Sequence, residues 1–343
     1  IDKRPASRST LRSTGWIDGA PVSARGESML LRQLMDLAGP AAAGAEVGPG
    51  DDAAAWRLSG GCLGLWSTDS MVEDIDFRRR YQTPYQVGWK AWVGAASDLA
   101  AMGANPRGGL VAAAFPGDTP APAVEAIQLG LVDAAAADGA FVLGGDLSRT
   151  DGPLVLTVTV LGELSEGSPV LLRGGSVEDA LVVTGSLGLA AAALEVLEQG
   201  SGEVPLPWNE RFLQPRSRTL AGVALRRAGA SAMTDISDGF LRDLGRLCEA
   251  SGVGAEVWLD CLPVAAGPRS EVSETLALTG GEDFELLAAI PDHLVGQLNA
   301  SWSQGLPPLS RLGVLTEEKG IRLLKGQGGE PIDLPDGDGF QHF

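Results

Sequence analysis

Hydrophobic and polar positions alternate with two different periods along most of the chain. Apolar residues that recur at helical spacing predict helices at 27–38, 86–102, 120–138, 189–198, 215–228, 239–251 and 291–300. Short apolar runs, several rich in β-branched residues, predict strands at 63–68, 109–115, 141–143, 154–161, 181–184, 255–259 and 285–290. Residues 201–210 hold glycine, proline and polar residues and are predicted to be a loop. This alternation of strands and helices indicates an α/β fold.

The pattern restarts after the polar segment 163–169, which indicates a boundary between two domains. A chain of 343 residues is also about twice the length of a typical domain. We expect residues 1–24 to be a flexible arm or an expression remnant. Residues 25–164 are then expected to form an N-terminal domain, and residues 165–343 a C-terminal domain.

The net charge narrows the range of partners. The chain carries 44 acidic and 26 basic side chains, which gives a formal net charge of −18. A uniformly anionic surface repels nucleic-acid phosphates and anionic lipids, so we expect neither nucleic acid nor a membrane as a partner. No apolar stretch of the sequence approaches the roughly 18 residues of a transmembrane helix.

Cysteine and histidine usage narrows the chemistry. The three cysteines, Cys62, Cys248 and Cys261, have no paired or metal-type spacing, so we expect reduced core thiols in a cytoplasmic protein. Only two histidines are present, His293 and His342, which argues against histidine-based catalysis. A catalytic site in this chain would therefore rest on other groups.

Carboxylates stand beside glycines or hydroxyl side chains at five places where strands are expected to end. These clusters are Gly50-Asp51-Asp52, Ser67-Thr68-Asp69, Gly144-Gly145-Asp146, Asp235-Ile236-Ser237-Asp238-Gly239 and Gly280-Gly281-Glu282-Asp283. Taken singly, each is typical of a turn or a helix cap. In open α/β folds, however, ligands bind at the carboxyl ends of strands. If the clusters converge, their mutual repulsion requires cations, and hard oxygen ligands select Mg²⁺ or Ca²⁺.

Asp98 adds a further carboxylate. Its neighbours at helical spacing in the predicted helix are Gly94, Ala95, Ala101 and Met102, a small apolar stripe that should face protein. A buried carboxylate without a partner is costly, so we expect a metal ion or an arginine against it. The alternative is a helix edge that is more solvated than this spacing indicates.

Familiar nucleotide-binding motifs are absent from the sequence. It has no G-x-x-x-x-G-K-[ST] loop, no G-x-G-x-x-G after a strand, and no H-R-D or D-F-G kinase signature. Oxygen-rich metal sites with scattered glycines and arginines still suit phosphoryl transfer, in which metal ions and positioning do most of the catalysis. A nucleophile that is itself a phosphate oxygen needs no general base, in keeping with a chain that has two histidines.

At these residues the chain resembles the thiamine-monophosphate kinase family, in the superfamily that includes aminoimidazole-ribonucleotide synthetase and selenophosphate synthetase. The resemblance covers residues 26–343 and rests on seven motifs in the family's order. They are Gly48-Pro-Gly-Asp-Asp52, Ser67-Thr-Asp-Ser-Met-Val-Glu73, Ser97-Asp-Leu-Ala-Ala-Met-Gly-Ala104, Gly144-Gly-Asp146, Asp235-Ile-Ser-Asp-Gly239, Gly280-Gly-Glu-Asp-Phe-Glu285 and Gly339-Phe-Gln-His-Phe343. It implies a two-domain α/β (α+β) fold, with an N-terminal mixed sheet packed with helices and a C-terminal α/β domain that completes the active site.

The resemblance also implies ATP-dependent phosphorylation of thiamine monophosphate to thiamine diphosphate, by direct in-line transfer with several Mg²⁺ ions. The metal shell it implies is Asp52, Ser67, Thr68, Asp69, Asp98, Asp146, Asp235 and Asp238. The catalytic carboxylates it implies are Asp69, Asp98, Asp146 and Asp238. The residues it places at ATP are Gly145, Asp146, Arg173, Ser237 and, near the base, Gln128. The residues it places at the substrate are Asp76, Glu282 and Phe340. A homodimer built through the N-terminal domains is implied as well, while the number of metal ions and a need for K⁺ stay open.

Two positions depart from the family pattern. The histidine of the family's T-D-x-x-V-x-x-x-H-F run is Asp76 here, and an aromatic residue near the ATP base is Gln128. Because Asp76 would repel a phosphate unless a metal ion intervenes, a non-catalytic protein that binds ATP and Mg²⁺ stays open as an alternative. Another enzyme of the superfamily is a further alternative. Against it, the chain has no reactive cysteine before Cys62, no cysteine motif at its end, and an Asp-Ile-Ser-Asp-Gly pattern that the aminoimidazole branch lacks.

Overall fold

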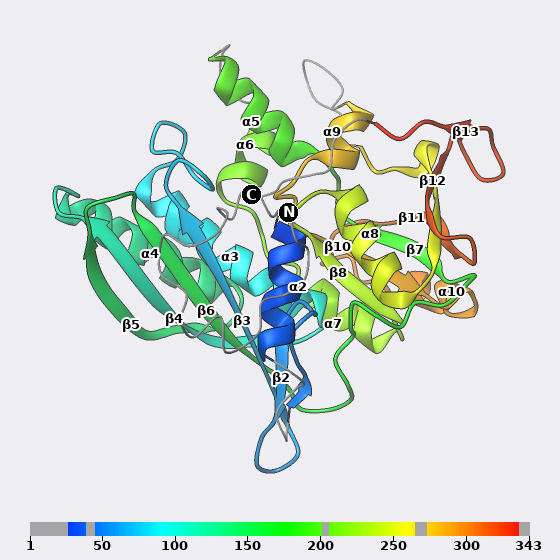
Figure 1. Cartoon of the computed structure of the whole chain (residues 1–343), viewed down its shortest axis with the longest axis horizontal. Coiled ribbons are helices and arrows are strands. Elements are labelled where there is room, and N and C mark those ends of the chain that lie inside the picture. The colour runs from blue at the N-terminus through cyan, green and yellow to red at the C-terminus, as the bar shows by residue number, and fades with distance from the viewer. Residues whose placement is uncertain (1–26, 39–44, 201–205, 265–272, 336–343) are drawn as a thin grey trace.

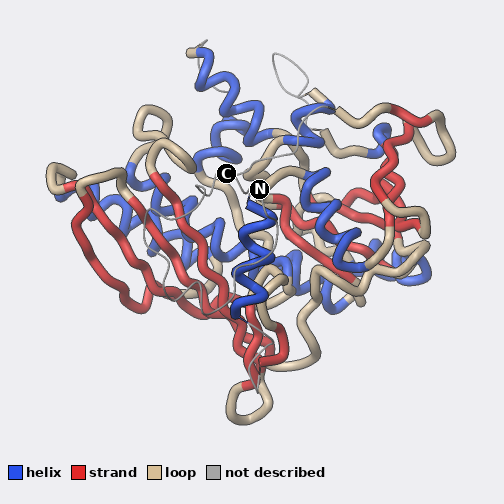
Figure 2. Tube along the Cα trace, in the orientation of Figure 1, coloured by secondary structure: helices blue, strands red, loops and turns tan. Residues whose placement is uncertain are grey.

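The computed structural model describes residues 27–38, 45–200, 206–264 and 273–335. Its strands form two sheets that lie side by side, each with helices packed against it (Figures 1 and 2). The first sheet takes its strands from the chain before residue 165, and the second takes its strands from residue 180 onward. The predicted arm at residues 1–24 lies outside the described residues, and the domain limits stay a prediction.

The first sheet has six strands in the order β1-β2-β3-β6-β4-β5, antiparallel throughout except for the parallel pair β4-β5. Its strands are β1 (Ala45–Val47), β2 (Ala54–Arg57), β3 (Leu63–Val72), β4 (Asn105–Pro116), β5 (Phe141–Thr150) and β6 (Val155–Leu164). Buried and half-exposed residues alternate at every step of β6, because only one face of this sheet packs against helices.

Two helices, α3 (Pro84–Ala101) and α4 (Ala121–Ala137), cover the buried face of the first sheet. Helix α3 begins at a capping box in which Thr83 and Gln86 exchange hydrogen bonds, with Pro84 at its first position. The two helices cross closely, since a Cβ atom at Gly88 would lie 2.0 Å from the backbone oxygen of Ile127. Glycine is therefore required at this crossing.

The second sheet has seven strands in the order β13-β12-β9-β11-β7-β10-β8. Its strands are β7 (Ala180–Thr184), β8 (Ala232–Ile236), β9 (Gly254–Trp258), β10 (Glu285–Ile290), β11 (Leu309–Thr316), β12 (Gly320–Leu324) and β13 (Pro331–Ile332). Strands β7, β8 and β10 are buried at every residue because helices pack on both faces of the sheet. The helices of this half are α5 (Leu189–Gln199), α6 (Leu206–Leu213), α7 (Thr219–Arg227), α8 (Phe240–Ser251), η2 (Leu259–Cys261), α9 (Glu274–Thr279) and α10 (Asp292–Ser301).

Helix α3 belongs to both halves of the molecule. Its Trp92 is fully buried in the core of the first sheet, whereas its Ala100 is buried in a cluster with Met233 of the second sheet. The segment between them carries Ser97 and Asp98. The helix therefore delivers these two polar side chains to the line where the sheets meet.

The predicted helices agree with the structure better than the predicted loops. The helix expected at 27–38 is α2 (Glu27–Ala38), which runs along the line where the two sheets meet in Figure 1. The loop expected at 201–210 is wrong for residues 206–210, which form most of α6 because Trp208 packs into a small core. The helix expected at 215–228 begins only at Thr219. Strands β1, β2, β8, β11, β12 and β13 were not predicted.

Two acidic clusters that were expected at strand ends lie inside strands. Strand β3 continues through Ser67, Thr68 and Asp69 to Val72, and β5 continues through Asp146 to its end at residue 150. Both strands continue because β6 and β4 pair with them along these segments. The expectation that these two clusters stand at strand ends is therefore wrong.

The three cysteines are free thiols. Cys248 is buried, Cys62 is half-buried and Cys261 is exposed, so the prediction of core thiols is confirmed for Cys248 and wrong for Cys261. Burial raises the pKa of Cys248 to about 11. In the described part of the chain, no helix combines the length and hydropathy needed to cross a membrane.

Candidate active site

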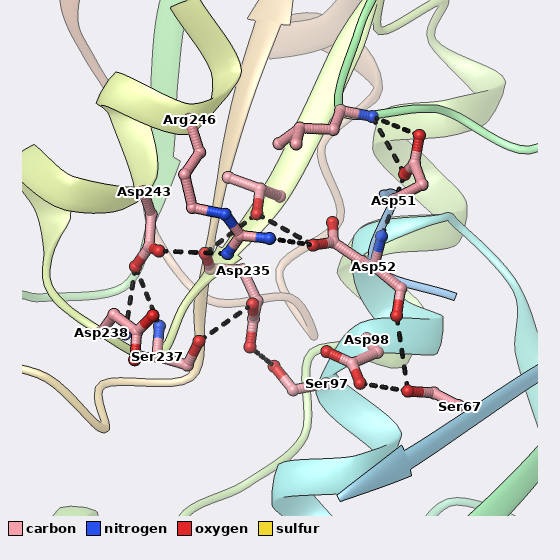
Figure 3. Close-up of polar contacts among 12 residues, drawn as sticks. Asp51, Asp52, Ser67, Ser97, Asp98, Asp235, Ser237, Asp238, Asp243 and Arg246 are labelled. Carbon is pink, nitrogen blue, oxygen red and sulfur yellow. Dashed lines mark hydrogen bonds and ion pairs between the residues drawn. The ribbon is translucent and has the colours of Figure 1, made fainter. Parts of the chain in front are cut away.

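Three aspartates from distant parts of the chain meet where the two sheets join (Figure 3). Asp52 lies between β1 and β2, Asp98 lies in the last turns of α3, and Asp235 lies near the end of β8. Burial raises the pKa of Asp98 well above its usual value, and the charges of Asp235 and Asp52 raise it further. The three carboxylates, called the acidic cluster below, therefore lie close enough to repel one another.

Serine hydroxyls hold two of these carboxylates in place. Ser97 Oγ, which is buried, donates a hydrogen bond to Asp235 Oδ2 at 2.5 Å. Ser67 Oγ on β3 donates to Asp98 Oδ2, and it also lies 3.4 Å from the backbone oxygen of Asp52. These bonds link different elements, so the two serines join four segments of the chain around the cluster: the β1–β2 loop, β3, α3 and β8.

Asp51 and Asp52 have separate tasks although they are adjacent. Both carboxylate oxygens of Asp51 accept hydrogen bonds from the backbone N–H of Leu172, at 3.1 and 3.2 Å, which ties this loop to the second half. The side chain of Asp52 is 3% exposed, and its Oδ1 accepts a 3.4 Å hydrogen bond from Thr234 Oγ1. Its Oδ2 has no hydrogen-bond partner among the described residues. A buried carboxylate oxygen without a donor is costly, so it marks a place for a cation.

The loop after β8 is held by Asp243 of α8. Asp243 Oδ2 accepts hydrogen bonds from the backbone N–H groups of Ser237, Asp238 and Gly239, at 3.1 to 3.2 Å. Burial raises the pKa of Asp243 to about 8, and the charges of Asp235 and Asp238 contribute. The hydrogen bonds fix the loop that carries Ser237 and Asp238 beside the acidic cluster.

Arg246 brings a positive charge to the cluster. Its Nη2 lies 3.7 Å from Asp52 Oδ1, and its Nη1 lies 3.5 Å from Asp243 Oδ1. Burial acts to lower the pKa of Arg246, but the charges of Asp52 and Asp243 outweigh this effect and raise it. One guanidinium group does not balance the negative charge of the cluster. The pKa values of Asp52 and Asp235 stay raised, and burial is the largest cause for both.

The donor set of the cluster fits magnesium. It consists of oxygen atoms, it is largely buried, and it includes the unpartnered Oδ2 of Asp52. Within the described ranges, no three acidic, histidine or cysteine side chains already surround a point where one ion would sit. Mg²⁺ is usually held by one or two carboxylates together with water and phosphate oxygens, and not by an all-protein cage. The arrangement therefore suits Mg²⁺ that is bound together with a phosphate compound.

Asp69 and Thr68 point in different directions from β3. Asp69 is exposed, its charge acts on Asp98, and its Oδ2 lies 2.7 Å from the position that a Cβ atom on Gly94 would take. Glycine on α3 therefore leaves room for this carboxylate. Thr68 Oγ1 lies 3.0 Å from Thr159 Oγ1, on the other face of the sheet. The side chain of Asp69 thus joins the edge of the acidic cluster, and the side chain of Thr68 does not.

A cavity of about 700 Å³ lies beside the acidic cluster, between the two halves. Asp69, Ser237 and Asp238 line the end nearer the cluster, and Asp76 and Glu282 also line it. Glu282 has a left-handed backbone with φ of 65°, and its backbone N–H donates to the backbone oxygen of Ser237 at 2.7 Å. The size of the cavity suits a small molecule.

Asp76 lines this cavity, but its carboxylate has a partner within its own turn. Its Oδ2 accepts a hydrogen bond from the backbone N–H of Val72 at 2.8 Å. Its own backbone N–H donates to the backbone oxygen of Val72 at 2.9 Å. The carboxylate that replaces the family's histidine therefore stabilises a turn.

The residues expected at ATP fall into two groups. The first group lies near the acidic cluster. The charge of Arg173 acts on Asp51, in the loop that also carries Asp52, and Ser237 lines the cavity described above. Gln128, Gly145 and Asp146 line a second cavity, of about 690 Å³, between α4 and β5. Strand β5 stands three places from β3 in the sheet, which is about 14 Å at the usual spacing. The structure therefore does not bring Asp146 to the acidic cluster of its own chain.

Phe340 lies outside the described residues. Sequence reasoning missed Lys90, Asp243 and Arg246, which the structure places around the cluster and the cavity. Signals for them were present, because Lys90 is a lone charge in an apolar stretch of its helix. Asp243 and Arg246 are three residues apart on α8, so they share one face just after the Asp235–Asp238 loop.

Comparison with known proteins gives this architecture a class. The family described as AIR synthase related protein, N-terminal domain, matches residues 50–164, and the corresponding C-terminal domain matches residues 176–325. These matches make the chain an AIR synthase related protein, and the predicted fold class is confirmed.

Curated relatives narrow this class. The thiamine-monophosphate kinase of Bacillus subtilis is 30% identical over 305 residues, which cover 87% of this chain and 94% of the relative. That of Salmonella typhimurium is 33% identical over 327 residues, which cover 93% and 98%. The chain belongs to the thiamine-monophosphate kinase family. Among solved structures, AaThiL complexed with AMPPCP and TMP has a TM-score of 0.81 at 27% identity, over 95% of this chain and 99% of that chain.

Proposed function

We propose that this protein phosphorylates thiamine monophosphate to thiamine diphosphate, with ATP as the phosphate donor. Its relatives carry the name of this activity, and the similar AaThiL structure contains AMPPCP, an ATP analogue, together with TMP. The observation that carries the proposal is the acidic cluster, which lies beside a cavity of small-molecule size whose wall includes Asp69 and Asp238. Such a site can hold metal ions and two phosphate compounds at once.

Mg²⁺ is the ion that we propose for this site. Asp52, Asp98 and Asp235 would hold it, with Asp69 and Asp238 on the side of the cavity. Bound there, Mg²⁺ supplies positive charge that stabilises the phosphoryl oxygens during in-line transfer. Five carboxylates are more than one such ion uses, so the proposal is for several ions.

The side chains of the protein then act mainly by positioning the two reactants. The acceptor is a phosphate oxygen, which is already a nucleophile and needs no general base. In this proposal Arg173, whose charge acts on Asp51, and Ser237, which lines the cavity, contact the ATP phosphates. In this proposal Glu282, which also lines the cavity, accepts a hydrogen bond from the amino group on the pyrimidine ring of thiamine.

A homodimer built through the first sheet is part of this proposal. Strand β5 is an edge strand, and its Phe141, Leu143 and Leu147 are 61 to 69% exposed. A long apolar edge strand is a ready surface for a second chain. A copy seated on β5 would lie against Gly145 and Asp146, which accounts for their distance from the acidic cluster of their own chain.

We also propose that the protein works in the cytoplasm. Its three cysteines are free, and one of them, Cys261, is exposed. Thiols persist in reducing compartments, whereas oxidising compartments favour disulfides. A cytoplasmic location also agrees with the proposed activity, because that activity consumes ATP.

Turnover with purified protein tests the proposed activity. The protein is incubated with ATP, MgCl₂ and thiamine monophosphate, with and without KCl, and the products are separated by ion-pair chromatography. We expect equal amounts of thiamine diphosphate and ADP, and none of either in EDTA. Protein that binds ATP and Mg²⁺ but forms no thiamine diphosphate at any tested Mg²⁺ or K⁺ concentration would instead be the non-catalytic alternative.

A further inference from the structure

Lys90 is a buried cation that none of the roles described so far uses. It lies on α3, its side chain is 2% exposed, and its neighbours along the helix are Trp89 and Ala91. Burying an ammonium group without a partner costs several kcal/mol. A lysine at this position therefore needs a reason.

The ammonium group has two partners from the second half of the molecule. Its Nζ lies 2.6 Å from Oε1 of Glu282, and 4.4 Å from the centre of the Phe212 ring on α6. Among the described residues it has no well-directed hydrogen bond. Its charge is therefore balanced by an ion pair and by the face of an aromatic ring. All three side chains line the cavity.

The backbone around Glu282 is held independently of this ion pair. The N–H of Glu282 donates to the oxygen of Ser237, and the N–H of Phe284 donates to the oxygen of Ile236 at 2.9 Å. Both Glu282 and Phe284 have left-handed backbones, with φ of 65° and 48°. The loop therefore has a fixed path, and the contact with Lys90 is what fixes the carboxylate at the end of the Glu282 side chain.

Exposure separates the roles of the two charges. The side chain of Glu282 is 33% exposed and lines the cavity, whereas that of Lys90 is almost wholly covered. A ligand in the cavity can therefore reach the carboxylate of Glu282 more readily than the ammonium group behind it. Lys90 occupies Oε1, and the rest of the carboxylate is left to accept a hydrogen bond from a ligand.

We propose that Lys90 is a positioning residue for the substrate: it holds the Glu282 carboxylate against the cavity wall so that this carboxylate accepts hydrogen bonds from the ring end of thiamine monophosphate. The inference rests on the proposed function, in which Glu282 binds that ring. It assigns Lys90 to the binding of one reactant only, because the residues proposed for ATP lie on the side of the acidic cluster or at the second cavity, between α4 and β5.

A purely structural role would look different. If Lys90 only joins α3 to the second half, its loss would lower the stability of the fold. It would also weaken the binding of both reactants to a similar extent. If Lys90 contacts the substrate directly, its loss would weaken substrate binding even when Glu282 has already been replaced. These two cases can be separated from positioning by a double-mutant cycle.

The experiment compares wild type, Lys90→Met, Glu282→Gln and the double variant. Binding of thiamine monophosphate and of AMPPCP is measured for each by calorimetry at one fixed Mg²⁺ concentration. We expect Lys90→Met to lower the affinity for thiamine monophosphate about tenfold or more, and the affinity for AMPPCP by less than about twofold. Adding Lys90→Met to Glu282→Gln should have no further effect. Lys325→Met, at an exposed lysine of the second half, is the control and should bind both ligands like wild type.

Two results would overturn the proposal: equal weakening of both ligands by Lys90→Met, or the same weakening in the Glu282→Gln background. Should Glu282→Gln fail to fold because it leaves the buried ammonium group of Lys90 without its ion pair, Lys90→Met and the double variant, which removes both charges, still decide. Positioning predicts that these two variants bind thiamine monophosphate equally, and weaker binding by the double variant would overturn it. Wild-type protein that binds thiamine monophosphate without phosphorylating it rejects the kinase and leaves this test intact. Wild-type protein that does not bind it rejects both.

Discussion

Ser97 of α3 donates a hydrogen bond of 2.5 Å to Oδ2 of Asp235, and this buried bond joins the helix of the first sheet to a strand of the second. Ser97→Ala would leave the carboxylate oxygen without its donor, at a cost of about 1–3 kcal/mol. We expect the free energy of unfolding in urea to fall by that amount, and turnover to fall with it. Ser168→Ala, at an exposed serine, is the control. Unchanged unfolding free energy and turnover would show that this hydrogen bond contributes to neither stability nor activity.

Asp69→Asn should abolish most of the activity while leaving the fold intact. The substitution removes a charge from the edge of the acidic cluster but keeps the size of an exposed side chain. We expect kcat to fall by a factor of about 10²–10⁴, with a change in unfolding free energy below about 0.5 kcal/mol. Asp118→Asn, at an exposed position between β4 and α4, is the matched control. Near-normal turnover of the Asp69 variant would show that Asp69 is merely a polar residue on the strand.

Asp76→His should separate ligand binding from stability. Removing an anion from the cavity wall should leave the affinity for thiamine monophosphate unchanged or improve it. The backbone N–H of Val72 loses its acceptor, so we expect the free energy of unfolding to fall by about 1 kcal/mol. Asp76→Asn keeps an acceptor and serves as the comparison. A large loss of affinity in both variants would mean that Asp76 binds the ligand or a metal ion.

The stability of the protein should depend on pH through Asp283. Burial raises the pKa of Asp283 to about 7, although the backbone N–H of Gly188 and the charge of Arg211 lower it. The ordinary value is 3.8, so between about pH 4 and pH 7 the folded protein binds more protons than the unfolded chain. The free energy of unfolding therefore falls as the pH rises through this window. Below and above the window, the contribution of Asp283 does not change with pH.

Asp283→Asn, which resembles the protonated side chain, should not show this loss. The unfolding free energy of the variant minus that of wild type should rise from near zero at about pH 4 to a few kcal/mol at about pH 7, and then level off. Urea unfolding of both proteins in EDTA at several pH values measures it. The difference between the two proteins isolates Asp283 from the aspartates of the acidic cluster, which titrate in both. A difference that does not vary with pH contradicts the raised pKa.

The proposed homodimer predicts complementation between two inactive variants. If Asp146 serves the site of a second copy and Asp69 serves its own, a mixed dimer of Asp69→Asn and Asp146→Asn regains one intact site. Random mixing of the two should then restore about a quarter of wild-type turnover, since half of the dimers are mixed. Leu147→Glu, on the exposed edge strand, should give a monomer by light scattering and no complementation. Mixed variants that stay inactive would place both carboxylates in one chain.

The sequence predicted the structure best where the spacing of residues within one helix decides which side chains face protein. The periodic apolar positions of α3 predicted its length within a few residues and also that Asp98 faces protein, where it is half-buried and desolvation raises its pKa. Strand ends were harder to predict, because polar residues on the open face of a sheet look like the start of a loop. Ser70 on β3 is an example, since its hydroxyl pairs with Thr157 across the strands at 2.8 Å.

The resemblance implied that distant carboxylates converge in one metal shell, and the structure brings Asp52, Asp98 and Asp235 together. It could not predict that Asp146 would stand apart, because that depends on the order of strands in the sheet and not on local spacing. The pairing of Lys90 with Glu282 was hidden for the same reason, since 192 positions of chain separate two residues whose contact exists only after both halves have packed.

Because α3 is embedded in the cores of both sheets, the two halves cannot swing apart as rigid bodies without exposing Trp92 on one side or Ala100 on the other. We therefore expect reactants to enter and leave past the loops at the rim of the cavity, without a hinge movement of the two halves. Heating should reveal the same constraint as a single calorimetric transition in place of two.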